Sequence, residues 1–389
     1  MFKKSLIAIA ALGAFAGSAM AADITISGRI DTGLNFHDQE ITGHTDATKN
    51  VDQNTFQMKA GQYSGSRVTI KGAEELGNGM KAGFVLENGF DSDDGELGQS
   101  GRIFGREAIV YLEGDFGHFS MGRVGALSSG LGSYSIVYGY TPYGAGWGDY
   151  AGAKGEFMLD DRNRFDNTLT YRSPEFAGVQ IYAQYSFKVD TSDTDENAQS
   201  TKNKRYAALG ATYNLGAFST GLVVDTIKNE STATNTEDSL GISWGASYDL
   251  GFTKPMIMVQ YGQNEKELGG WTSAELWDTA VTSDEGLKGY AVSLGAVTPL
   301  FGGNLYTAVN YTDGETEADV TFAGSVKSAD IERWGVAVGY DYPLSKRTKL
   351  YGFAAYNEGE AKITGVRTGN SHKFEEQDIE AGVGLIHYF

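Results

Sequence analysis

Four cationic side chains lie at alternate positions in segments that are otherwise apolar on one face. In Ile24–Asp31 every second position is isoleucine or, at Gly28, glycine, which leaves Arg29 on the polar face. The same alternation places Arg67, Lys71 and Arg172 on the polar faces of their own segments. Arginine stays charged at any working pH, and charges that line a pore bias which ions and polar solutes pass. These four residues are therefore candidates for an electrostatic filter.

Acidic side chains gather in the longest stretch that lacks regular alternation, residues 125–165. The stretch is rich in Gly, Ser and Tyr and contains Asp149, Glu156, Asp160 and Asp161. A link this long in a compact domain is usually functional, and the alternative is a surface loop that only connects two elements. The acids are candidates for the charge that opposes the arginines.

The remaining chemical signals favour neither catalysis nor metal binding. The chain has no cysteine and its five histidines lie apart, without the spacing of metal ligands: His37, His44, His118, His372 and His387. The acidic run 91–96 lacks the full twelve-residue calcium loop, so we interpret it as a solvated loop. Asp160 and Asp161 are adjacent rather than facing each other across a cleft, which is a poor arrangement for acid/base work. The sequence also lacks the nucleophile-elbow, P-loop and zinc-protease motifs, and we predict no enzyme and no cofactor.

Charge and the N-terminal residues narrow the class of protein further. The formal net charge of −19 argues against a nucleic-acid partner, which needs a basic face. Residues 1–21 combine a basic start, a short apolar run and the small residues Ala19 and Ala21 around a cleavage point. We interpret them as a secretory signal peptide and assign residues 22–389 to one exported domain.

Alternation of period two continues along the whole exported part, which predicts an all-β fold. In Val179–Phe187 every odd residue is apolar or aromatic, and Leu240–Leu250 repeats the pattern with glycine and serine on the other face. A soluble sandwich and a membrane barrel both fit this pattern. Segments of about ten residues, a wet polar face, and short links that alternate with long ones favour the barrel.

Sixteen strands can be placed on this rule, with short turns on the periplasmic side and eight longer loops on the other. Their expected ranges are 24–36, 62–73, 80–90, 102–114, 117–124, 166–173, 178–189, 203–214, 217–228, 239–249, 256–264, 288–299, 304–314, 329–342, 347–357 and 377–389. A closed barrel leaves no unpaired strand edge in lipid. At sixteen strands the interior is too wide for side chains to fill, so it holds water.

Several blocks of this sequence resemble the general porins of beta-proteobacteria and Neisseria. They are Ser66–Ala82, Phe104–Ala108, Gly117–Arg123, Arg164–Gly178 and Gly382–Phe389. The resemblance implies a sixteen-stranded, trimeric barrel whose third long loop folds inward and narrows the pore. It also implies that the terminal Phe389 is read by the barrel-assembly machinery.

The resemblance adds two residues to the predicted constriction. Alternation does not put Arg123 on the polar face, because Phe119 and Met121 share its phase, but the family pattern has a constriction arginine there. Arg106 is ambiguous for the same reason and is included. An arginine row that faces acids across a narrow aqueous gap would produce a strong transverse field.

The function that we predict is a general diffusion porin of the Gram-negative outer membrane. It would pass ions and small hydrophilic solutes, with a weak preference for anions because the constriction senses local charge rather than the total. Its expected partners are two further copies of itself, outer-membrane lipids including lipopolysaccharide, and the assembly machinery. A barrel enzyme and a surface adhesin are the alternatives, and planar-bilayer conductance separates them from a channel.

Overall fold

Almost every described residue belongs to a strand or to a link between strands. The computed structural model describes residues 23–43, 50–152, 162–189, 204–228, 237–265, 267–268, 271–272, 286–317, 320–322, 325–365 and 371–389. The predicted signal peptide, residues 1–21, lies outside these ranges. The helical pieces described are a single turn, α2 (Gly98–Gly101), and a 3-10 turn, η2 (Val137–Tyr140). No described helix has the length and apolar content that crossing a membrane requires.

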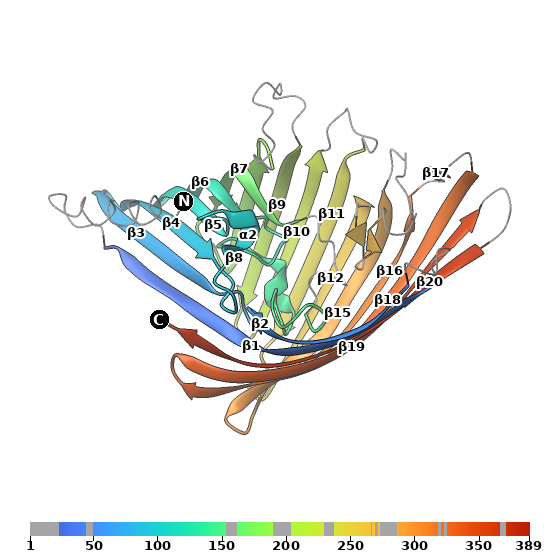
Figure 1. Ribbon diagram of the computed structural model, residues 1–389. Coiled ribbons are helices and arrows are strands. Elements are labelled where there is room, and N and C mark those ends of the chain that lie inside the picture. The colour runs from blue at the N-terminus through green and yellow to red at the C-terminus, as the bar shows by residue number, and fades with distance from the viewer. Residues whose placement is uncertain are drawn as a thin grey trace.

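The main described sheet has eighteen strands, and sixteen of them form the closed antiparallel wall of a barrel, which confirms the predicted fold class (Figure 1). Neighbours along the chain pair with each other throughout the wall, so the topology is a simple meander. The wall strands are β1 (Thr25–Thr42), β3 (Arg67–Gly77), β4 (Met80–Gly89), β5 (Glu107–Gly114), β6 (Gly117–Gly125), β7 (Arg164–Arg172), β8 (Val179–Ser186), β9 (Arg205–Leu215), β10 (Phe218–Lys228), β11 (Ser239–Tyr248), β12 (Lys254–Glu265), β15 (Leu287–Leu300), β16 (Gly303–Thr316), β18 (Ser325–Ser345), β19 (Thr348–Gly365) and β20 (Ser371–Tyr388).

The two ends of the chain close the ring. β1 pairs with β20 from Arg29 opposite Tyr388 to Thr42 opposite Glu375. Beyond the last strand, the Phe389 amide donates to the Gly28 carbonyl at 3.1 Å, and the Gly28 amide donates to the Phe389 carbonyl at 3.0 Å. The final residue therefore takes part in the hydrogen bonding that closes the barrel.

Inward and outward side chains alternate as the sequence predicts. On β9, Leu209 is 66% exposed on the outer face, whereas its neighbour Ala208 is buried inside. On β10, Leu222 and Val224 are exposed outward and Asp225 is buried inward. Apolar side chains thus face outward and polar side chains face inward. This is the reverse of a water-soluble protein, and it suits a barrel with hydrocarbon outside.

Two predicted strands differ from those in the structure near the N-terminus. Residues 62–73 were expected to form one strand, but β3 begins at Arg67 and a separate strand, β2 (Val51–Ala60), precedes it beside β1. The break follows Gly61, whose φ of +67° turns the chain. Asp31 then holds the intervening turn, because its carboxylate accepts from the Ser64 amide at 2.7 Å. The strand predicted at 102–114 likewise begins only at Glu107.

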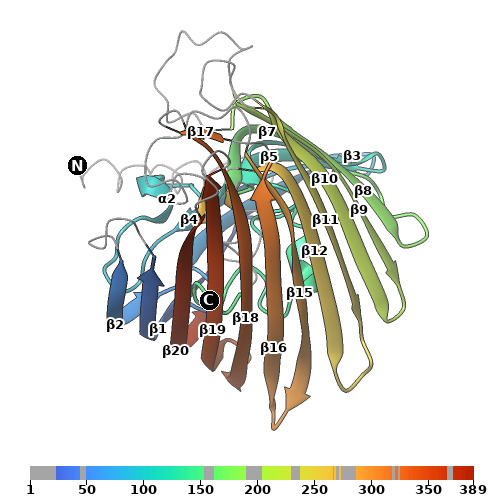
Figure 2. The same ribbon diagram turned by 90° about the vertical axis from the view of Figure 1, so that its right-hand side faces the viewer.

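Strands in the C-terminal part are longer than predicted. β18 has 21 residues and β19 and β20 have 18 each, and Figure 2 shows them as the tall part of the wall. The apolar pattern of one face ends where charged residues replace it, at Glu358, Glu360 and Lys362, yet the backbone ladder continues. Three smaller elements complete the described structure: β17 (Val320–Phe322), which pairs with β18, and the two-residue strands β13 (Glu267–Leu268) and β14 (Trp271–Thr272).

We expect Gly28→Ala to weaken closure of the barrel. A Cβ atom at Gly28 would lie 2.4 Å from the Arg67 carbonyl oxygen and 2.5 Å from the Phe389 ring, and the backbone oxygen cannot move freely. Overpacking of this kind costs about 1–3 kcal/mol. Urea unfolding in lipid vesicles, read by the gel mobility of unheated samples, measures the loss.

Gly352→Ala is the matched control on β19, because its Cβ atom would lie 3.4 Å from the nearest neighbour, an ordinary contact. Equal stabilities for the two variants would contradict the assigned role of Gly28.

Candidate functional site

Five arginines converge on one sector of the inner wall, and we call them the arginine cluster: Arg67, Arg102, Arg106, Arg123 and Arg164. Two carboxylates bind four of them. Glu87 lies 2.9 Å from Arg106 Nε and 3.4 Å from Arg67 Nη1. Asp166 lies 2.9 Å from Arg102 Nη1 and 2.6 Å from Arg123 Nη1.

The cluster keeps an excess of positive charge. Arg164 is repelled by both Arg106 and Arg123, and its buried Nε atom has no hydrogen-bond partner among the described residues. Arg67 is repelled by Arg106 and by Arg29. Because like charges held this close raise the electrostatic potential of the sector, an anion near it gains free energy.

A β-bulge explains why alternation fails at Arg123. The pairing of β6 with β7 shifts between Gly122 and Val124, so that two steps on β6 face three on β7. Gly122 has a φ of +141° and Asn167 on β7 has a φ of +50°. A bulge redirects a side chain out of the strand's regular phase. Arg123 thereby reaches Asp166 and also donates to the Gly105 carbonyl at 2.8 Å.

The link between β6 and β7, residues 126–163, is the third loop, and its two ends are fixed to the same wall carboxylate. Near its start, Ser128 Oγ donates to Asp225 Oδ2 at 2.5 Å. Near its end, Arg162 Nε donates to Asp225 Oδ1 at 2.8 Å, and Arg162 Nη1 also pairs with Glu265 of β12. All three charged side chains are buried, so the ion pairs form away from water.

Burial and pairing set the charge state of this anchor. Burial lowers the pKa of Arg162, but Asp225 and Glu265 raise it by more, so that the pKa lies above its ordinary value. Elsewhere in the loop, burial raises the pKa of Tyr134 to about 12, and the neutral hydroxyl lies 2.7 Å from Nε2 of His118. The loop is thus held by one permanent cation and by neutral hydroxyl groups.

The middle of the third loop packs against the opposite side of the inner wall. Tyr143 donates to the Tyr306 carbonyl at 3.0 Å, and the Trp147 ring lies 4.7 Å from the Tyr306 ring. Farther along, the amides of Asp149 and Tyr150 donate to Glu380 of β20 at 3.0 and 2.9 Å. Figure 1 shows this blue-green segment inside the ring of strands.

Glycines on the wall make room for the loop. A Cβ atom at Gly245 would lie 2.6 Å from the Tyr140 ring, and one at Gly295 would lie 2.4 Å from Pro142. The other members of this row, with the loop side chains that a Cβ atom would meet, are Gly210 (Ile136), Gly221 (Ile136 and Tyr140) and Gly339 (Trp147 and Tyr143). Side chains of the loop therefore lie directly against the wall backbone, in space that a side chain at these positions would occupy.

The other predicted constriction residues are spread around the wall. Arg29 adjoins the cluster, because Arg29 and Arg67 both donate to Ser64 Oγ, at 3.0 and 3.1 Å. Lys71 is exposed and acts electrostatically on Glu107. Arg172 lies apart from the cluster, 3.9 Å from Glu113.

The predicted acids lie away from the arginine cluster where they are described. Asp149 pairs with Lys59 of β2 at 2.5 Å. Glu156, Asp160 and Asp161 lie outside the described residues. In the acidic run, Asp94 accepts from the Glu96 amide at 2.8 Å, and the described residues contain no group of three metal-ligating side chains.

Sequence reasoning missed the carboxylates that organise the site. Glu87, Asp166 and Asp225 each lie in a strand that crosses the wall. Alternation was the available signal for Asp225, since Leu222 and Val224 face outward and leave it inward. Its pairing with Arg162 joins residues 63 positions apart, and no spacing rule predicts that contact.

Comparison with known proteins gives one consistent result. A family model described as Gram-negative porin matches residues 8–362. Outer membrane porin protein 32 of Delftia acidovorans is 30% identical over 395 residues and covers the whole of both chains.

Two solved structures show the same fold. An anion-selective porin from Comamonas acidovorans has a TM-score of 0.65 and 22% identity, over 95% of this chain and 100% of that one. The trimer form of OmpT, an outer membrane protein of Vibrio cholerae, has a TM-score of 0.59 and 15% identity, with the same coverage.

We expect Arg162→Ala to destabilise the protein strongly. The change leaves Asp225 and Glu265 buried without their cation, which costs about 3–5 kcal/mol. The free energy of unfolding in urea, measured in lipid vesicles, reports the loss.

Arg172→Ala is the control, because this partly exposed arginine makes a long contact with Glu113 and no other ion pair within the described ranges, and the change should cost less than about 1 kcal/mol. Similar losses in both variants would show that the buried pairs do not hold the loop.

Proposed function

The chain belongs to the Gram-negative porin family, and from this premise we propose that the arginine cluster makes its channel prefer anions. Membership makes the protein a passive diffusion channel of the Gram-negative outer membrane and not an enzyme. The closed barrel provides the path, because its apolar side chains face outward and its polar ones inward. Solutes then move down their own gradients without energy input.

The observation that carries the proposal is the unequal charge of the cluster. Two carboxylates, Glu87 and Asp166, bind four of the five guanidinium groups, so an excess of positive charge stays on one sector of the wall. Charge next to a narrow aqueous path selects ions more strongly than the net charge of the whole chain, which salt screens. The similarity to an anion-selective porin supports the same preference.

We also propose that the third-loop acids oppose the cluster across the constriction. Asp149 has a side chain that is 60% exposed, so its charge remains available to solutes. Glu156, Asp160 and Asp161 would add to it. Arg29, Lys71 and Arg172 would extend the positive side along the path.

Replacing Arg67 and Arg164 together by Gln should move the reversal potential in a salt gradient toward that of a cation-preferring channel. The change leaves Arg106, Arg102 and Arg123 with their carboxylates, so the local fold is kept. Each of the two charges acts over 4 Å of water with about 1 kcal/mol, so removing both should change the anion-to-cation permeability ratio by at least about fivefold.

The control removes the same charge elsewhere. Lys346→Gln with Arg347→Gln alters two exposed residues at the turn between β18 and β19. A reversal potential that moves equally in both double variants would assign the preference to net charge instead of the cluster.

We further propose that three copies assemble and that β2 lies at their contact. Among the described residues β2 pairs only with β1, so its other edge has no strand beside it. Its outward residues Phe56 and Met58 are 72% and 57% exposed. An uncovered strand edge in a membrane is costly, and a second copy would cover it. The similarity to a protein solved as a trimer supports the assembly.

Phe56→Ser with Met58→Ser should convert trimers to monomers, as light scattering in mild detergent would measure. Val309→Ser with Val338→Ser is the control, because these outward residues are 53% and 47% exposed on fully paired strands. Trimers that persist in the first variant, or vanish equally in the second, would reject this contact.

Export and insertion complete the proposal. Residues 1–21 would direct the chain out of the cytoplasm, and Phe389 would be recognised by the barrel-assembly machinery. Lipids of the outer membrane, lipopolysaccharide among them, would surround the apolar outer face.

A further inference from the structure

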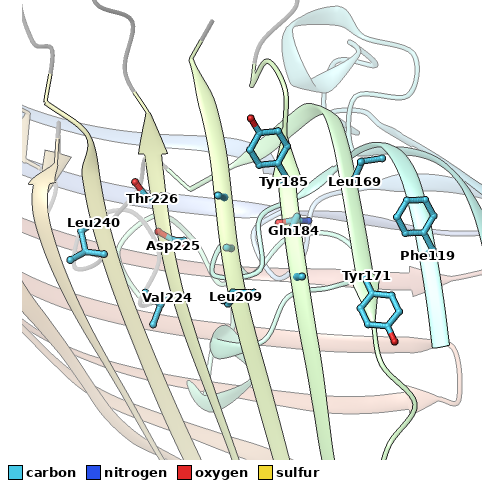
Figure 3. Close-up of a pocket in the computed structure, with 13 residues that line it drawn as sticks. Phe119, Leu169, Tyr171, Gln184, Tyr185, Leu209, Val224, Asp225, Thr226 and Leu240 are labelled. Atoms are coloured by element: carbon cyan, nitrogen blue, oxygen red, sulfur yellow. The ribbon is translucent and has the colours of Figure 1, made fainter. Parts of the chain in front are cut away.

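An apolar groove runs across the outer face of β7, β8, β9 and β10. Its volume is about 520 Å³. Leu169 and Tyr171 form one side of the groove, and Leu209 and Val224 form the other, as Figure 3 shows. Its apolar lining distinguishes this groove from the hollow beside β15, β16, β18 and β19, whose lining is largely charged.

Two small side chains create the groove. Ala183 of β8 lies between Tyr171 on one neighbouring strand and Leu209 on the other. One pair farther along the strands, Ala207 of β9 lies beside Tyr185. Because the small residues are offset from strand to strand, the hollow they leave runs obliquely across the wall. Its lining exposes almost only apolar atoms, which suits a hydrocarbon chain.

The groove ends at two cations. A second hollow of about 240 Å³ shares Tyr185, Ala207 and Thr226 with the groove and is lined beyond them by Arg205 and Lys228. These two residues are directly opposite each other on β9 and β10. Like charges in that relation repel each other, and an anion placed between them removes the repulsion.

The partners of the two cations leave them able to bind an anion. The buried Nε atom of Arg205 has no hydrogen-bond partner among the described residues. Lys228 is 56% exposed, and its Nζ atom lies 3.3 Å from Asp238. A surface pair of this kind is weak, so Lys228 can turn to a second anion at little cost.

The positive charge beside β9 and β10 contrasts with the charge beside other strands at the same end of the barrel. Along β15, β16, β18 and β19 the corresponding hollow is lined by five acids and two lysines: Asp313, Glu315, Asp330, Glu332, Glu360, Lys288 and Lys362. Lys288 there is already paired with Glu315 at 3.0 Å. An anionic ligand is therefore favoured beside β9 and β10 and disfavoured beside β15–β19.

We propose that this groove and its two cations form a binding site for a phosphorylated, multiply acylated glycolipid of the lipid A type. An acyl chain would lie along Ala183 and Ala207, and a phosphate group would lie between Arg205 and Lys228. The cations lie at the end of the barrel that carries the long links, which the topology places at the outer leaflet. This inference rests on the proposed function, since it needs the barrel to be seated in the outer membrane.

Binding of purified bis-phosphorylated lipid A to the refolded chain in detergent, followed by native mass spectrometry, tests the proposal. Arg205→Gln with Lys228→Gln should weaken binding by about tenfold or more, because each cation next to an anionic lipid adds to the affinity. Ala183→Leu with Ala207→Leu fills the groove without changing charge and should weaken binding as well. Phosphate-free lipid A should bind as weakly to the wild type as lipid A binds to the charge variant, and inorganic phosphate should not compete.

Lys288→Gln with Lys362→Gln is the matched control and should bind lipid A like the wild type. Unchanged binding in the charge variant or in the groove variant would overturn the site, as would full competition by inorganic phosphate. Planar-bilayer conductance separates this inference from the proposed function. A wild type that conducts but fails the lipid tests loses only the lipid site, whereas a wild type that does not conduct is not a channel.

Discussion

The requirement that every backbone amide and carbonyl in the wall find a partner determines the rest of this structure. In hydrocarbon each backbone amide or carbonyl without a hydrogen-bond partner costs several kcal/mol of stability. The ladder between β1 and β20 meets this requirement by joining the two ends of the chain. Closure in turn divides the side chains into an outer and an inner set, and only then can alternation have a function.

The inner set is organised by carboxylates more than by arginines. Glu87 and Asp166 gather four guanidinium groups on one sector, and Asp225 secures both ends of the third loop. Each acid lies on a wall strand, where the ladder fixes its height and direction. The flexible part of the site is thereby positioned by the rigid part, which is how a long loop acquires one conformation.

Regular alternation could be read from the sequence, and local irregularities could not. The fold class and the strand order follow from the period-two pattern and from the alternation of short and long links. The places where the sequence-based prediction was wrong or ambiguous share one cause, which is a local break in the period-two alternation. The bulge at Gly122 redirects Arg123, and the turn after Gly61 divides the second strand into β2 and β3.

Contacts between distant segments were the other part that the sequence did not reveal. Arg162 meets Asp225 only because the third loop returns across the barrel, and the glycines of the wall have meaning only once that path is known. Gly210, Gly221 and Gly245 resemble ordinary polar-face residues in the sequence. In the structure they mark the track along which the loop side chains Ile136 and Tyr140 lie against the wall.

The double attachment of the third loop to Asp225 also affects how the flux of solutes through the channel is controlled. Ser128 and Arg162, near the two ends of the loop, are both held by Asp225 of the wall, so neither end has to move when a solute passes. The passage therefore behaves as a sieve rather than as a carrier. Its throughput rises in proportion to the concentration difference across it and to the number of copies in the membrane.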